Sequence, residues 1–142
     1  MTSLLDINVL IALLDQDHIH HNAATRFFQN LGPDGWATCP LTENGILRIL
    51  SRPLAQGGIG SPEEVRRHLI AWCDYPGHQF WPDGLSLTST STFPKLPSSQ
   101  HLTDLYLLAL AVKHGARFAT FDAGIDASLI PGGPAAFYLI PS

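Results

Sequence analysis

The stretch SLLDINVLIALL, residues 3–14, decides the fold of this chain. Its first half is a short apolar run that ends at Asp6, and its second half, residues 9–14, has the apolar density of a helix. The polar Asp-x-Asn between the halves favours a buried strand that turns into a helix over one long element. The stretch is too short to span a bilayer, and no Lys or Arg precedes it, as a signal peptide would require. It therefore predicts a strand that ends at an aspartate and leads directly into a helix.

Strands and helices alternate along the rest of the chain. The other apolar runs that predict strands are residues 36–39, 79–81, 117–121 and 137–140. The segments that predict helices are residues 20–31, 40–52, 61–75 and 103–114. This alternation predicts an α/β fold of three layers (α/β/α), in which a central, mostly parallel sheet is covered by helices on both faces. We expect residues 1–142 to form a single domain, because the length suits one domain and there is no internal repeat.

The composition limits the partners and the compartment of the protein. Of its 142 residues 14% are charged, and 12 acidic against 8 basic residues give a net charge of −4. This negative net charge excludes the class of proteins that bind nucleic acid mainly through a broad basic surface. Cys39 and Cys73 are too few and too far apart for a disulfide framework or a zinc-ligand pair. We therefore expect a cytoplasmic protein, outside the membrane, in which each acidic residue has a reason for its position.

Four acidic residues fall at the same edge of the predicted sheet. Asp6 and Asp122 end strands, whereas Glu43 and Asp104 lie in the first turns of two helices. Ligands of such sheets bind beyond the carboxyl ends of the strands. Each acid alone has an ordinary explanation, because helix N-termini and turns favour carboxylates. Four carboxylates together repel one another, so the cluster indicates a bound cation.

The ligand chemistry indicates which cation this edge binds. Carboxylates without a cysteine favour a hard ion, so we expect Mg²⁺, with Mn²⁺ as a substitute. Such an ion would let an acidic site act on an anionic phosphodiester, because it activates a water and stabilises the charge that develops on phosphorus. The acids therefore predict a metal-dependent enzyme that hydrolyses phosphodiester bonds.

Four segments of the chain resemble the conserved segments of a known family. They are residues 4–11, residues 42–43, residues 102–109 and residues 119–122. In this order and spacing they are similar to the PIN-domain ribonucleases, and in particular to the VapC-type toxins of bacterial toxin–antitoxin pairs. The Ser/Thr-rich residues 86–100, which contain no acid, depart from the family pattern.

The resemblance implies a function and a set of site residues. The implied catalytic and metal-binding residues are Asp6, Glu43, Asp104 and Asp122. Asn8 and Thr120 occupy positions that are often polar in the family and are expected to support the site. The resemblance also implies a PIN-like fold, an RNA substrate, a small antitoxin protein as partner and a homodimer.

Basic and imidazole side chains near the site are weaker candidates. The His18-x-His20-His21 spacing is not a standard zinc pattern, so we expect no zinc there, although His20 could contact RNA by stacking on a base or touching a phosphate. Arg48 follows Glu43 by five residues, which places it about 140° away around a helix. A phosphate contact by Arg48 and a solvent-exposed arginine remain equal alternatives.

Two other functions remain open from the sequence alone. A phosphatase of the haloacid dehalogenase type also begins its sheet with an aspartate, but it needs a second aspartate two residues later, where this chain has Asn8. It also needs a suitably placed lysine, and the chain offers only Lys95 and Lys113. A phospho-receiver-like module without catalysis would bind metal and a partner without turnover.

Overall fold

The first strand ends where the Asp-x-Asn pattern predicts. In the computed structural model, which describes residues 1–142, β1 spans Ser3–Leu5 and α1 spans Ile7–Leu14. Asp6 between them has an extended backbone (φ −61°, ψ 155°), and its side chain accepts a hydrogen bond from the backbone N–H of Ile7. Aspartate suits this position because its carboxylate pairs with an N–H that the first turn of a helix leaves without a partner. Asp6 therefore lies at the carboxyl edge of the sheet.

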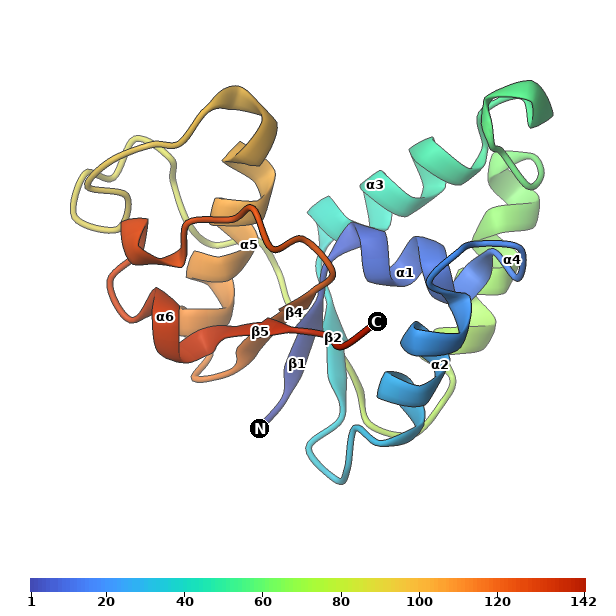
Figure 1. Cartoon of the computed structure of the whole chain (residues 1–142), viewed down its shortest axis with the longest axis horizontal. Helices are drawn as coiled ribbons and strands as arrows, with labels where there is room; N and C mark the ends of the chain where they lie inside the picture. The colour runs from blue at the N-terminus through green and yellow to red at the C-terminus, as the bar shows by residue number, and fades with distance from the viewer.

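Five parallel strands form one sheet in the order β3-β2-β1-β4-β5 (Figure 1). The remaining strands are β2 (Trp36–Thr38), β3 (His78–Phe80), β4 (Arg117–Thr120) and β5 (Phe137–Leu139). In the central strand, Leu4 lies opposite Ala37 of β2 and Phe118 of β4. Because β2 and β4 flank β1 and run in the same direction, the residues that follow all three strands meet at one edge. This confirms the parallel sheet that the sequence predicts.

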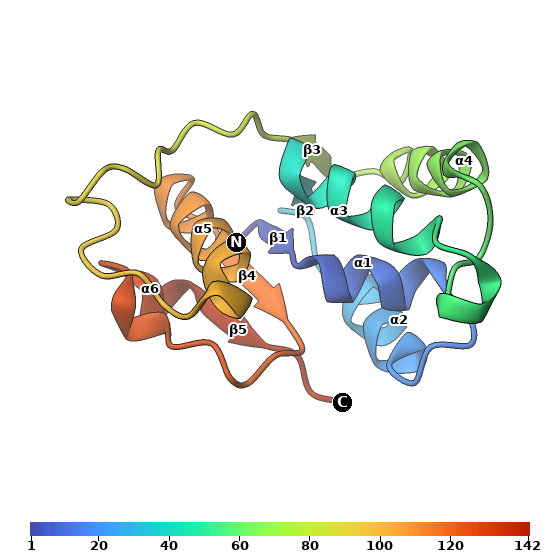
Figure 2. The same cartoon turned by 90° about the horizontal axis from the view of Figure 1, so that it is seen from above.

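Helices cover both faces of the sheet, with α1 to α4 on one side and α5 and α6 on the other (Figures 1 and 2). The helices after α1 are α2 (His21–Gln29), α3 (Pro40–Leu50), α4 (Pro62–Cys73), α5 (Leu102–Lys113) and α6 (Gly133–Ala136). Three short 3₁₀ helices are η1 (Leu54–Gln56), η2 (Ser99–His101) and η3 (Ala127–Leu129). The three-layer α/β/α architecture is thereby confirmed. None of the helices has the length and apolar character that crossing a membrane requires.

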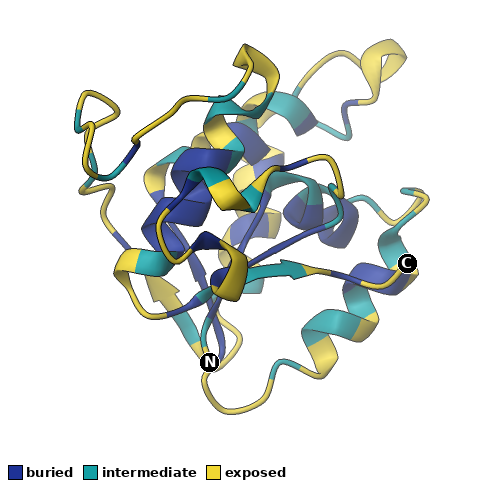
Figure 3. Cartoon of the chain, turned by 60° about the vertical axis from the view of Figure 1, so that its left-hand side comes forward, coloured by how far each residue is buried: buried dark blue, intermediate teal, exposed yellow.

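Helix α5 lies in the middle of its layer and is covered on both sides. Its residues from Leu105 to Ala111 are all buried, and Figure 3 shows the buried segments gathered along the strands and the inner helices. The segment between β3 and α5 contributes to this burial, because the ring of Phe93 stacks on Tyr106 with 6.2 Å between centroids. The apolar sequence of α5 is therefore explained by contacts with both the sheet and this segment.

The structure differs from the elements predicted by the sequence at two places, before the C-terminal strand and at β3. Residues 131–134, with the sequence Pro-Gly-Gly-Pro, predict no helix, yet α6 begins at Gly133. Gly132 precedes it in the left-handed region (φ 77°), which glycine adopts without steric cost. The predicted strand 79–81 lies one residue earlier, at His78–Phe80. These differences leave the carboxyl edge of the sheet unchanged.

Candidate active site

The carboxylate of Asp6 is held at the centre of the edge by two hydrogen bonds. The backbone N–H of Ile7 donates to its Oδ1 at 2.7 Å, and the Thr120 hydroxyl donates to its Oδ2 at 2.6 Å. The residue is only 3% exposed. Asp6 is therefore a buried acid with a fixed orientation.

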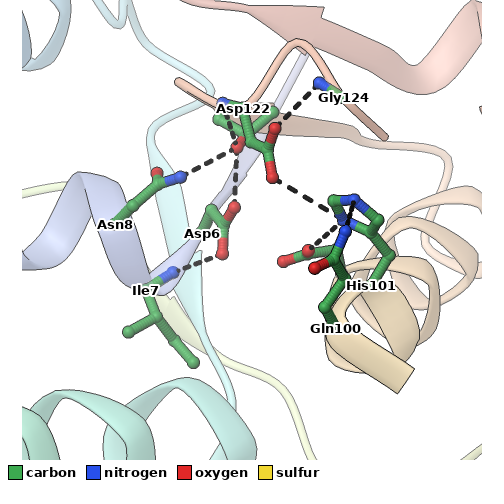
Figure 4. A network of polar contacts seen from close by, with 9 residues as sticks. Asp6, Ile7, Asn8, Gln100, His101, Asp122 and Gly124 are labelled. Carbon is green, nitrogen blue, oxygen red and sulfur yellow. Dashed lines mark hydrogen bonds and ion pairs between the residues drawn. The ribbon is translucent and has the colours of Figure 1, made fainter. Parts of the chain in front are cut away.

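The end of β4 is joined to the start of α1 by a polar network (Figure 4). Asn8 donates from Nδ2 to the Thr120 hydroxyl at 3.2 Å and accepts at Oδ1 from the backbone N–H of Phe121 at 3.4 Å. The Thr120 hydroxyl also accepts from the backbone N–H of Asp122 at 3.0 Å. Asn8 and Thr120 thus contact the very segments that carry Asp6 and Asp122.

A third acid and a histidine lie beside Asp122. Asp104, in the first turn of α5, has its Oδ2 3.3 Å from Nδ1 of His101, and the same nitrogen lies 3.7 Å from Oδ2 of Asp122. One ligand atom from each of these residues lies within 4.8 Å of the other two. The sequence patterns do not indicate His101 as a site residue. The signal that could have found it is the His-x-x-Asp spacing at the start of a helix, which places both side chains on one face.

Electrostatic repulsion and burial act on the same carboxyl groups. Burial raises the pKa of Asp6 to about 7, with hydrogen bonds from Thr120 and Ile7 opposing the rise. The negative charges of Asp104 and Asp122 also raise the pKa of Asp6. Burial raises the pKa of Asp104 as well, and its hydrogen bond with His101 opposes that rise. Two of the three aspartates are thus disfavoured as carboxylates in the metal-free protein, and a bound cation would reverse this.

Glu43 lies outside this group of residues. Its Oε2 accepts a 2.9 Å hydrogen bond from the hydroxyl of Thr38, which also lies 2.8 Å from Nε2 of His78. The residue of α3 that faces α1 is Gly45, where an added Cβ would come within 2.4 Å of the Ile7 side chain. Glu43 is two positions before Gly45, and side chains two positions apart in an α-helix point about 200° away from each other around the helix axis. The structure therefore brings Asp6, Asp104 and Asp122 together and places Glu43 toward β2 and β3.

The histidines near the start of α2 have separate contacts. The ring of His20 stacks on Phe121, the residue before Asp122, with 4.7 Å between centroids and 15° between planes. Nδ1 of His21 lies 2.7 Å from the carbonyl oxygen of Ala12. Nδ1 of His18 accepts from the backbone N–H of His20 at 3.0 Å. These three histidines do not form a group that could bind a metal ion. Only His20 is placed next to the site, through its contact with Phe121.

Arg48 lies in the last turn of α3 and is exposed. It takes part in none of the salt bridges of the chain, which join other residues. A phosphate contact by this side chain therefore stays a prediction.

The site has the donor atoms that a divalent cation requires. Asp104 and Asp122 are partly accessible and both face an imidazole nitrogen, and the buried Asp6 is close enough for their negative charges to raise its pKa. Oxygen-rich sites of this kind bind Mg²⁺ or Mn²⁺ and leave positions for water and for substrate phosphate. The residues thus fit a bound divalent cation, with Asp104, Asp122 and Asp6 as the residues that would hold it.

The comparison with known proteins identifies the family. The family model described as PIN domain matches residues 3–127. The chain belongs to the PIN-domain family. This confirms the resemblance that the four sequence segments carry. The matched range of this PIN domain contains all four acids considered above.

Curated relatives of this PIN domain are similar over almost their whole length. Ribonuclease VapC39 of Mycobacterium tuberculosis is 42% identical over 134 residues, which cover 93% of this chain and 96% of the relative. Ribonuclease VapC44 of the same organism is 38% identical over 135 residues, which cover 93% and 94%. The crystal structure of VapC20, described as a Sarcin-Ricin loop cleaving toxin, superposes with a TM-score of 0.64 at 15% identity and covers 91% of this chain and 96% of that one. At this identity the structural similarity supports the PIN fold.

Proposed function

We propose that this PIN domain is a metal-dependent endoribonuclease and the toxin of a toxin–antitoxin pair. The observation that carries the proposal is the convergence of Asp6, Asp104 and Asp122 at the carboxyl edge of the sheet, within a chain whose relatives are named ribonucleases. The proposed ion is Mg²⁺, with Mn²⁺ as a substitute.

Each residue of the site has a distinct part in the proposed reaction. A bound divalent cation supplies an activated water and stabilises the charge that develops on phosphorus. Asp104 and Asp122, which are partly accessible, would hold the cation together with the buried Asp6. Thr120 fixes the positions of Asp6 and Asp122 relative to each other through its hydrogen bonds to both, and Asn8 holds the Thr120 hydroxyl. Glu43 is proposed as a fourth acid with a minor part, because it reaches the cation only if it leaves the Thr38 hydroxyl.

The phosphatase alternative has no support in the geometry. It requires a general acid two residues after Asp6, but Asn8 occupies that position and uses its amide to bind Thr120 and the backbone of Phe121. Lys113 lies in the last turn of α5, at the opposite end of that helix from Asp104. A nuclease explains the residues present at the site better.

RNA cleavage by purified protein tests the proposal. We expect cleavage of single-stranded RNA with Mg²⁺ or Mn²⁺, no cleavage in excess EDTA, and recovery when the metal is restored. Asp104→Asn should lower the rate by about a hundred-fold or more. Asp126→Asn is the matched control, because this exposed acid caps η3 and lies outside the cluster. Undiminished cleavage in EDTA would exclude the proposed function.

The toxin role also implies partners and a compartment. We propose a small antitoxin protein as partner, a homodimer, and action in the cytoplasm on cellular RNA. A partly exposed aromatic surface supports a protein partner, because the partly buried Phe28 and Trp72 and the exposed Tyr75 line a groove between α2 and the end of α4. Expression of the chain with and without the protein encoded beside it should arrest growth only when it is expressed alone. Light scattering of the purified chain measures the oligomeric state.

A further inference from the structure

His101 lies where a ligand of the cation would lie. Its Nδ1 is 3.3 Å from Asp104 Oδ2 and 3.7 Å from Asp122 Oδ2. Adjacent ligands of an octahedral ion with bonds of about 2.1 Å are about 3 Å apart. Nδ1 of His101 thus lies at close to the separation of an adjacent ligand from each carboxylate, and the ligand atoms of the three residues all lie within 4.8 Å of one another.

The other ring nitrogen of His101 has a polar neighbour. Nε2 lies 3.4 Å from the side-chain amide nitrogen of Gln100 (Figure 4). A histidine that binds a metal through one nitrogen usually donates the N–H of the other to a nearby acceptor. Rotation of the Gln100 amide by a half-turn would bring its oxygen to Nε2, since the two amide atoms occupy similar positions. As placed, the Gln100 amide nitrogen faces Nε2, which suits Nδ1–H as the donor to Asp104. After the half-turn Gln100 would accept from Nε2–H and leave Nδ1 free to bind a cation.

The local backbone fixes the directions of His101 and Asp122. His101 ends η2 and precedes α5, and its N–H donates to the carbonyl oxygen of Ser98 at 3.1 Å. The N–H of Gly124 donates to Asp122 Oδ1 at 2.8 Å, which leaves Oδ2 facing the imidazole. An added Cβ at Gly124 would lie 3.1 Å from Asp122 Oδ1 and 3.7 Å from Cε1 of His101. The absence of a side chain at Gly124 keeps room for both groups.

We propose that Nδ1 of His101 binds the cation together with Asp104 and Asp122, and that this nitrogen makes the site prefer Mn²⁺ to Mg²⁺. The inference rests on the proposed metal-dependent function and goes beyond it by naming a ligand: both Mg²⁺ and Mn²⁺ support the proposed reaction, and the site binds Mn²⁺ more tightly. Mg²⁺ binds oxygen ligands almost exclusively, whereas imidazole suits transition-metal ions. An all-carboxylate site lacks this nitrogen ligand, so removal of His101 should weaken Mn²⁺ binding more than Mg²⁺ binding.

Pulsed electron paramagnetic resonance of the full chain loaded with Mn²⁺ tests the ligand directly. A directly bound imidazole couples its ¹⁴N nucleus to the manganese spin, so we expect a nitrogen signal from the unaltered protein. The signal should disappear in His101→Ala and in His101→Gln, with folding of each checked by circular dichroism. It should persist in His68→Ala, which removes an exposed histidine of α4.

Affinity measurements test the selectivity. Calorimetric titrations with Mn²⁺ and with Mg²⁺ should show tighter binding of Mn²⁺, and His101→Ala should weaken Mn²⁺ binding by at least about ten-fold while Mg²⁺ binding changes little. Bound Mn²⁺ without a nitrogen signal, or equal losses for both ions, would overturn the inference and leave the nuclease proposal intact. If neither Mn²⁺ nor Mg²⁺ binds to the protein, the proposed metal-dependent function is overturned instead.

Discussion

The hydroxyl of Thr120 donates a 2.6 Å hydrogen bond to the buried carboxylate of Asp6. Leu5 of β1 lies opposite Ala119 of β4, and Asp6 and Thr120 are the residues that come directly after this pair. The same hydroxyl oxygen accepts hydrogen bonds from the side chain of Asn8 and from the backbone of Asp122. One buried threonine thus links the two strand ends that carry aspartates of the site.

Thr120→Val should damage the site, and Thr120→Ser should preserve it. Valine has a similar volume but leaves one oxygen of Asp6 and the N–H of Asp122 without their partner. Loss of a partner for a buried polar group costs about 1–3 kcal/mol. We expect a comparable loss in the free energy of unfolding and a slower cleavage rate, measured by urea denaturation and by kcat/KM on RNA. If the valine and serine variants behave alike in both assays, the hydroxyl has no such role.

Asp6→Asn should abolish cleavage and stabilise the metal-free protein near pH 8. The pKa of Asp6 is about 7 in the folded chain, above its ordinary value of 3.8, because the carboxyl is buried. Between these pH values the folded state keeps a proton that the unfolded state releases, so stability falls as pH rises. Asparagine removes this loss and is an equally good helix cap. Its single carbonyl oxygen cannot accept from both Ile7 and Thr120, which offsets part of the gain. We expect a gain of about 1–2 kcal/mol, or about 3–6 °C in Tm.

Melting curves in EDTA at several pH values measure this effect. The Tm of the unaltered protein should fall relative to that of Asp6→Asn as pH rises from about 4 to about 7. Added Mn²⁺ should raise the Tm of the unaltered protein more than that of the variant. Parallel pH profiles of the two proteins would show that Asp6 is already ionised without metal.

The sequence predicts the positions of three aspartates because each one ends or begins a periodic pattern. Asp6 and Asp122 follow apolar strands, and Asp104 lies in the first turn of the apolar helix α5. His101 escapes this reasoning because it follows the Ser/Thr-rich residues 86–100, where no periodicity indicates direction. Its place beside Asp104 depends on the 3₁₀ turn η2, which lies before the helix predicted at residues 103–114.

The direction of Glu43 illustrates another limit of sequence reasoning. The first-turn position of Glu43 in α3 is correctly predicted, but its direction depends on how α3 is rotated about its axis. That rotation is set by close contact, because Gly45 allows α3 to pack against Ile7 of α1. A helix pattern gives the apolar face and not the exact neighbour of each polar side chain.

His20→Ala should weaken RNA binding more than it slows the chemical step. The imidazole stacks on Phe121 beside Asp122 and is only partly buried, so it offers a surface next to the site. Loss of one base-stacking contact costs about 1 kcal/mol or more, which predicts a rise of about five-fold in KM with kcat almost unchanged. His20→Phe keeps the ring and should retain most of the affinity. An unchanged KM in His20→Ala would remove this residue from the RNA-binding surface.

Glu43→Gln should lower cleavage much less than Asp104→Asn. Glutamine keeps a carbonyl oxygen that can accept the Thr38 hydrogen bond, and Glu43 lies outside the group formed by His101, Asp104 and Asp122. We expect a loss of less than about ten-fold in kcat/KM, against about a hundred-fold or more for Asp104→Asn. Thr38→Val serves as the companion variant, because it frees the Glu43 carboxylate without removing it. Equal losses in Glu43→Gln and Asp104→Asn, together with preserved activity in Thr38→Val, would mean that Glu43 turns into the site and binds the cation during catalysis.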